Sequence, residues 1–243
     1  MNPHLNQAFD KDYRIKRNFY AWKIKDPPAN CVKPFPISVI HSITYISKRL
    51  PETAHLLHGI ANMIIIALFF LLCLGEYTNG KSDTTTFTIG NVQMFISDRR
   101  LDLVNRSDAG LYQSWSVYTT FTTQNNGVDN EVVCMGLSGH HYICVVKAIK
   151  RRVCCLQSHN ATLSTPLARV YTDVGNCTAG VTPHLTTKTL HEAVTWMGAY
   201  LGSPPSEVST RYLCAAGAMD MLVAKVDPDI IQILVRWRSD EIF

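Results

Sequence analysis

The sequence lacks the short motifs that mark the best-known classes of enzyme. It contains no GxxxxGK[ST] phosphate loop, no GxGxxG turn, no HExxH pair and no GxSxG elbow. These motifs place the groups needed for nucleotide hydrolysis, dinucleotide redox chemistry, zinc proteolysis and serine hydrolysis. None of these four activities therefore has support in the sequence.

Residues at metal-binding spacing are also missing. None of the eight cysteines forms a CxxC pair with another. The residues Cys134, His140, His141 and Cys144 lie near one another in the sequence, but their intervals are irregular for a zinc site. A loop with solvated histidines followed by buried thiols explains them as well. We therefore expect no bound metal and no cofactor.

No apolar run has the length of a typical transmembrane helix. The longest, residues 63–74, has 12 residues, whereas a spanning helix needs about 20. Residues 1–8 have no apolar core of a secretory signal. We therefore expect an intracellular protein with reduced thiols and no membrane association. A membrane-anchored, disulfide-bonded glycoprotein is a weaker alternative, prompted by the cysteine count and by glycosylation sequons at Asn105, Asn160 and Asn176.

The composition is that of an ordinary globular protein. Hydrophobic residues make up 47% of the 243 residues and charged residues 17%. Helix-type and strand-type patterns both occur, so the expected fold class is α+β. The formal net charge of +4 permits an anionic partner without requiring one.

Residues 11–25 interleave basic and aromatic side chains. Such a mixture suits a nucleic-acid backbone, because cations neutralise phosphates and rings pack or stack. A solvated helix face explains the same pattern equally well. Four prolines between residues 27 and 36 then indicate a linker. The candidate DNA-binding residues of this segment are Lys16, Arg17, Lys23 and Lys25.

Apolar periodicity predicts two helices before a strand region and about four helices after it. Pro36 is expected in the first turn of the first helix, and Asp227 is expected to cap the last. The expected helices are residues 37–49, 55–74, 145–157, 187–201, 210–224 and 228–234.

Three segments rich in β-branched and aromatic residues predict a small sheet. They are residues 84–96, 114–124 and 130–137. The turn sequence Asn126-Gly127 between the last two favours a hairpin. We therefore expect a small three-stranded antiparallel sheet inserted between helices.

The helix predicted at residues 145–157 is amphipathic. One side carries the apolar residues Val145, Ile149, Val153 and Leu156, and the other carries the cations Lys147, Lys150 and Arg151. Of these cations, Lys150 and Arg151 are the candidates for DNA contact.

Five segments, in this order, resemble one protein family. They are "FFLLCLGEYT", "TTQNNGVDNEV", "YICVVKAIKRRV", "STRYLCAAGAMDML" and "VRWRSDEIF". Together they resemble the catalytic domain of the tyrosine recombinases, or phage integrases, in the branch found in mobile elements of eukaryotic microalgae and oomycetes. The resemblance covers the chain from about residue 25 to its end. It implies a mostly helical catalytic domain with a small inserted sheet.

The resemblance also implies a reaction. In this family a tyrosine attacks a DNA phosphate and forms a 3'-phosphotyrosine, which a 5'-hydroxyl later resolves. Two arginines clamp the phosphate oxygens in the transition state, so no metal is required. A lysine on a β-hairpin acts as general acid, and further His, Lys or Trp groups complete the pocket.

When the catalytic positions of the family are transferred to this chain, most of them hold other residue types. The first arginine position, three residues before Glu76, holds Cys73, and the second, which closes the "RYLC" box, holds Cys214. Arg211 occupies the histidine position of that box. The hairpin lysine corresponds to Asn125. The late His or Trp position falls on Arg236 or Trp237.

The resemblance divides the chain at the proline-rich linker. Residues 1–33 form a basic, aromatic segment that one interpretation takes as a remnant of the family's core-binding domain. Residues 34–243 form the catalytic domain, which ends before the family's nucleophilic tyrosine. We expect a catalytically inactive, monomeric protein that binds double-stranded DNA and is nuclear where expressed. The alternative is a fragment of an active integrase whose other active-site parts lie outside this reading frame.

Overall fold

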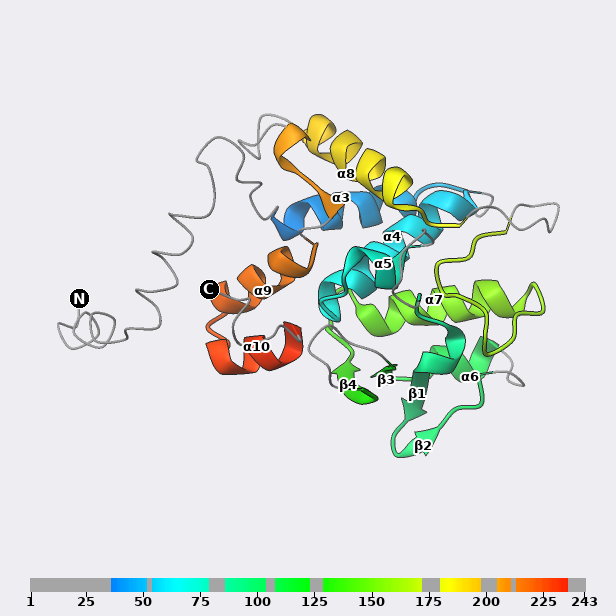
Figure 1. The fold of residues 1–243 in the computed structure, drawn as a ribbon. Coiled ribbons are helices and arrows are strands. Elements are labelled where there is room, and N and C mark those ends of the chain that lie inside the picture. The colour runs from blue at the N-terminus through cyan, green and yellow to red at the C-terminus, as the bar shows by residue number, and fades with distance from the viewer. Residues whose placement is uncertain are drawn as a thin grey trace.

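The computed structural model describes most of the chain after the linker. The described residues are 36–51, 54–78, 86–103, 108–122, 129–171, 180–197, 205–210 and 213–235. They form a mixed helical and antiparallel β structure (Figure 1). This arrangement agrees with the predicted α+β class. The expected segments at residues 1–33 lie outside the described residues.

Helix α4 (His55–Phe69) is the central element. It contacts α3 (Ile37–Ser47) and α8 (Pro183–Met197) on one side, and α7 (Val145–Gln157) and α9 (Leu213–Val223) elsewhere on its surface. In Figure 1, α3 and α8 lie above α4, while α7 and the sheet lie below it. A helix surrounded in this way needs apolar residues on all sides, which explains why every residue from Gly59 to Leu68 is buried.

The prediction that this helix continues to residue 74 was wrong. The helix ends at Phe69, and Leu71 adopts a left-handed backbone conformation with φ of 52°. Leu71 and Leu72 are nevertheless buried in the turn. The apolar run therefore reflects burial and not continued helix. A short helix, α5 (Leu74–Tyr77), follows with Cys73 as its N-cap residue.

The sheet has four antiparallel strands in the order β2-β1-β3-β4. The predicted hairpin is confirmed by the pairing of β3 (Ser116–Phe121) with β4 (Glu131–Gly136). The strand predicted at residues 84–96 is shorter than expected and corresponds to β1 (Val92–Ile96). The prediction of three strands missed β2 (Arg99–Arg100), which pairs with β1. Two exposed residues are too few to produce an alternating pattern in the sequence.

Aromatic rings connect the sheet to the end of α4. The ring of Phe121 on β3 makes edge contacts with Phe70, at 6.5 Å between centroids, and with Phe87, at 5.0 Å. All three side chains are buried. This geometry is the favourable one for paired aromatic side chains. The sheet thereby joins the main hydrophobic core.

Helix α7 has the predicted limits, and its four predicted apolar residues are buried. Its opposite side was predicted only in part, because Lys150 is only 5% exposed. Arg152, which the prediction assigned to neither side, falls at the helical spacing of the apolar residues and is only 2% exposed. The Arg152 guanidinium donates from Nε (2.9 Å) and Nη2 (2.8 Å) to the carbonyl of Leu167, and from Nη2 to the carbonyl of Arg169. These backbone carbonyls thus satisfy a cation that is buried together with the apolar side of α7.

The C-terminal region contains three further helices besides the short 3₁₀ turn at Pro205–Glu207. They are α8, α9 and α10 (Pro228–Val235). The predicted N-cap is confirmed, since the Asp227 carboxylate accepts a hydrogen bond from the Asp229 amide at 2.8 Å. The short helices α5 and α6 (Asp108–Tyr112) were not predicted.

No helix among the described residues is both long enough and apolar enough to cross a membrane.

Candidate functional site around Tyr77

Two of the proposed family positions lie at one junction of helices. Cys73 begins α5, directly after the turn that ends α4, and Cys214 lies in the first turn of α9. Cys214 and Leu71 share a small apolar cluster with Ile231 and Val235 of α10. The packing of α9 on α4 therefore brings the two sequence-distant cysteine segments together.

The Tyr77 side chain lies within electrostatic reach of both thiols. It is fully buried, and its hydroxyl donates a hydrogen bond to the carbonyl of Thr210 at 3.2 Å. Burial raises the pKa of Tyr77 far above its usual range; the contact with Thr210 opposes this effect, and Cys214 and Cys73 add to it. Both thiols therefore lie near enough to influence the ionisation of one buried hydroxyl.

A reciprocal capping interaction holds Cys73 in place. The Glu76 carboxylate accepts a hydrogen bond from the Cys73 amide at 2.6 Å, and the Glu76 amide donates to the Cys73 carbonyl at 2.9 Å. This capping box satisfies backbone groups at the start of α5. The three-residue spacing between Cys73 and Glu76 in the sequence thus corresponds to one hydrogen-bonded turn at the start of α5.

The chemistry of this site differs from a phosphate clamp. Thiols are weak donors that carry no positive charge, whereas an arginine offers five N–H donors in a fixed geometry. The buried Tyr77 hydroxyl keeps its proton at neutral pH and is covered from solvent. Cys73, Cys214 and Tyr77 therefore offer no cation for a phosphate, and the Tyr77 hydroxyl is not exposed as a nucleophile.

Gly217 makes this junction possible, and sequence reasoning did not single it out. A Cβ atom at this position would lie 2.5 Å from Leu71 Cδ2 and 2.6 Å from the Leu68 carbonyl oxygen. Only glycine permits α9 to approach the end of α4 so closely. The small residues of "CAAGAM" were the available signal for such a contact.

The two predicted DNA-contacting residues of α7 serve internal contacts instead. Lys150 donates from Nζ to the Tyr112 carbonyl at 2.9 Å, and burial lowers the pKa of its ammonium. Arg151 donates from Nε to Asn62 Oδ1 on α4 at 2.8 Å. The Lys150 side chain is buried between α7 and α6, while its role in DNA binding stays a prediction. Arg151 remains half-buried.

The other predicted site residues lie outside the described residues. They are Lys16, Arg17, Lys23, Lys25, Asn125, Arg211, Arg236 and Trp237.

Comparisons with known proteins give no assignment. No family model, curated protein or solved structure matches this chain. The family resemblance therefore stays a proposal, which depends on the sequence segments and on the arrangement around Tyr77.

The zinc interpretation gains no geometric support in the described part of the chain. No group of three or more metal-binding side chains gathers there. Cys134 is exposed on β4, whereas Cys144 is buried at the start of α7.

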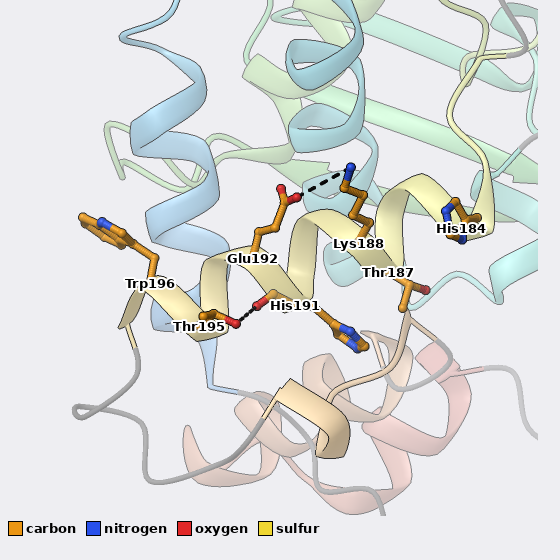
Figure 2. Close-up of a pocket in the computed structure, with 7 residues that line it drawn as sticks. All are labelled: His184, Thr187, Lys188, His191, Glu192, Thr195 and Trp196. Carbon is orange, nitrogen blue, oxygen red and sulfur yellow. Dashed lines mark hydrogen bonds and ion pairs between the residues drawn. The ribbon is translucent and has the colours of Figure 1, made fainter.

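A shallow depression follows the outer surface of α8 (Figure 2). Its polar groups are used locally: His191 Nε2 donates to the Val208 carbonyl at 2.7 Å, and Thr195 donates to the His191 carbonyl at 2.8 Å. The Lys188 ammonium lies 3.8 Å from the Glu192 carboxylate in an exposed pair. These contacts hold α8 and the following segment, and they form no pair of nucleophile and base.

Proposed function

We propose that this protein is a DNA-binding relative of the tyrosine recombinases whose catalytic pocket no longer supports strand cleavage. The observation that supports it is the packing of α9 on the end of α4, which places Cys214 in one apolar cluster with Leu71, two residues before Cys73. In the family, the residues at these two positions must reach the same phosphate. Any relative must therefore bring them to one place, however far apart they lie in the sequence.

Inactivity follows from the replaced side chains. Removing one preorganised donor to a developing anion costs about 3 to 4 kcal/mol of transition-state stabilisation. Cys73 and Cys214 represent two such losses at the same phosphate. Even if the losses are less than additive, the remaining rate would be very low.

Retained DNA binding is the second part of the proposal. The net charge of +4 and the basic residues of segment 11–25 favour association with a polyanion. We propose double-stranded DNA as the partner of a monomeric protein, and the nucleus as the place where it meets that partner. The second part is independent of the first, since binding does not require an intact pocket.

The pocket can be tested by restoring its cations. The Cys73→Arg/Cys214→Arg variant should bind a nicked duplex about tenfold more tightly than the native chain, because charged hydrogen bonds to phosphate are worth about 1.5 to 3 kcal/mol. A charge-matched control is Cys134→Arg/Cys155→Arg, at thiols on β4 and α7. Affinity is measured by fluorescence anisotropy at fixed salt.

Equal strengthening in both double variants would reveal only general charge attraction and would contradict the proposed pocket. Circular dichroism checks that each variant is folded, and Cys73→Arg alone tests the less buried position. Inactivity is tested separately with the native chain and a nicked half-site. A covalent protein–DNA band after denaturing electrophoresis would refute it.

A further inference from the structure

A cluster of rings and cations lies where α3, the loop at residues 137–144 and the start of α7 meet. We call it the ring-cation patch. It is built on His41, Tyr45, Lys48, His140, Tyr142 and Lys147. None of these residues belongs to the site around Tyr77. The patch joins two segments that are far apart in the sequence.

The rings hold one another in defined orientations. The Tyr142 ring makes edge contacts with His41, at 5.2 Å between centroids, and with Tyr45, at 5.5 Å. His140 makes a further edge contact with His41 at 5.5 Å. His140 Nδ1 also accepts hydrogen bonds from the Tyr142 amide at 3.1 Å and the Ile143 amide at 2.9 Å. The loop is therefore fixed against α3.

Cations lie over two of these rings. Lys48 Nζ is 4.7 Å from the centroid of the Tyr142 ring and donates to the His141 carbonyl at 2.8 Å. The Arg49 guanidinium is 3.8 Å from the centroid of the Tyr45 ring. Such cation–π contacts orient the charges without neutralising them. Both side chains belong to exposed residues, so their charges remain accessible.

The positive charges of the patch repel one another. Burial lowers the pKa of the Lys48 ammonium, and the charges of Arg151 and Lys147 lower it further, while the Cys144 thiol partly opposes them. No carboxylate in the described part of the structure forms an ion pair with Lys48, Arg49 or Lys147. An anion bound here would relieve this repulsion, whereas a neutral or cationic partner would not.

We propose that the ring-cation patch binds an unpaired strand of nucleic acid. Lys48, Arg49 and Lys147 would neutralise phosphates, and the exposed rings of His140 and His141, with Tyr142 beneath them, would stack on bases. Grooves that bind single strands combine these two features, since every base offers a flat face once it is unpaired. A duplex hides those faces within its own stack. The inference goes beyond the proposed function and does not depend on kinship with recombinases.

The test is fluorescence anisotropy of the full chain with a labelled oligothymidine of about 16 nucleotides, within the range of single-strand site sizes. The competitors are a duplex of the same length and inorganic polyphosphate. Stacking of even one base should make the single strand bind about tenfold more tightly than the duplex. Polyphosphate should compete weakly, because it offers charge without bases.

Variants separate charge from stacking. Lys48→Gln should weaken binding of all three anions, whereas Tyr142→Leu should weaken the single strand selectively by about tenfold. The matched controls are Lys188→Gln on α8 and Tyr112→Leu on α6, at exposed positions away from the patch. His141→Leu, at an exposed residue, tests stacking if Tyr142→Leu does not fold. Circular dichroism and thermal melting verify that each variant is folded.

Equal affinity for single strand, duplex and polyphosphate, with no selective effect of Tyr142→Leu or His141→Leu, would overturn the proposal and leave a general anion surface. Equal effects of the matched controls would also overturn it, because binding would then not be localised to the patch. If the chain bound the single strand but not the duplex, the proposed function would be contradicted and this inference would be supported.

Discussion

At the scale of single residues, Asp220 on α9 is a partly buried carboxylate with an unsatisfied oxygen atom. Its Oδ2 atom is buried and has no hydrogen-bond partner in the described part of the chain. Burial raises the pKa of this carboxyl above its ordinary value of 3.8. The folded state therefore disfavours the charged form of Asp220.

The sign of the resulting pH dependence follows from linkage. A carboxyl whose pKa is raised by folding contributes its full stabilisation at pH values below its ordinary pKa. This contribution is lost as the pH rises through the raised pKa of the folded state. We therefore predict that Asp220→Asn raises Tm by roughly 1 to 3 °C at neutral pH. The difference should vanish or reverse near about pH 3, where Asp220 is protonated in both states.

Thermal melting at the two pH values measures this effect. Asp98→Asn, in the exposed turn between β1 and β2, is the matched control and should change Tm little at either pH. An unchanged or lower Tm for Asp220→Asn at neutral pH would contradict the burial penalty.

At the scale of elements, the contact between α4 and α9 depends on one missing side chain. Gly217 lies in the middle of α9, where alanine would ordinarily favour the helix by about 1 kcal/mol. The Cβ of an alanine would lie 2.6 Å from the backbone oxygen of Leu68, which no side-chain rotation can relieve. Steric exclusion therefore outweighs helix propensity at this position.

We predict that Gly217→Ala lowers the free energy of unfolding by about 1 to 3 kcal/mol, the usual cost of overpacking. Urea unfolding measures this change, and faster labelling of Cys214 by a thiol reagent would report that α9 has moved. Gly136→Ala on β4 is the control, because its Cβ would meet nothing closer than the Trp115 carbonyl at 4.0 Å. A Gly217→Ala chain as stable as the native one would show that α9 shifts without cost.

At the scale of the whole molecule, α10 is attached less firmly than the other long helices. The main core includes buried residues of α3, α4, α7, α8 and α9, as well as the sheet. By contrast, the buried residues of α10, Ile231 and Val235, belong to the small cluster that contains Leu71 and Cys214, and α10 reaches the main core through the partly buried Leu234. Its outer side leaves Ile230 51% exposed and Ile233 64% exposed. Stability should therefore be uneven across the fold.

We predict that backbone amides of α10 exchange with solvent faster than those of α4 and α7. Hydrogen exchange followed by mass spectrometry at neutral pH measures this difference, with α4 and α7 as internal references. Equal protection of α10 and α4 would indicate that α10 opens only when the whole protein unfolds, and would contradict this prediction.

The amino-acid sequence by itself determined the elements that depend on near neighbours. The limits of α7, the pairing of β3 with β4 and the cap of α10 at Asp227 were all readable from local pattern. Periodicity and turn chemistry act over a few residues, so they need no knowledge of the fold. The two-residue strand β2 was too short to carry such a pattern.

Only the tertiary structure determined the features in which contacts between distant segments outweigh the local sequence pattern. It ended α4 at Phe69 although the apolar run continues, and it buried Lys150 on the polar side of α7 and Arg152 among the apolar residues. It also brought Cys214 against the turn that precedes Cys73, and His41 and Tyr45 to Tyr142. Each outcome depends on a surface supplied by a distant segment. A local sequence pattern records that a side chain is apolar or charged, but the partner that covers it is fixed only when the chain folds.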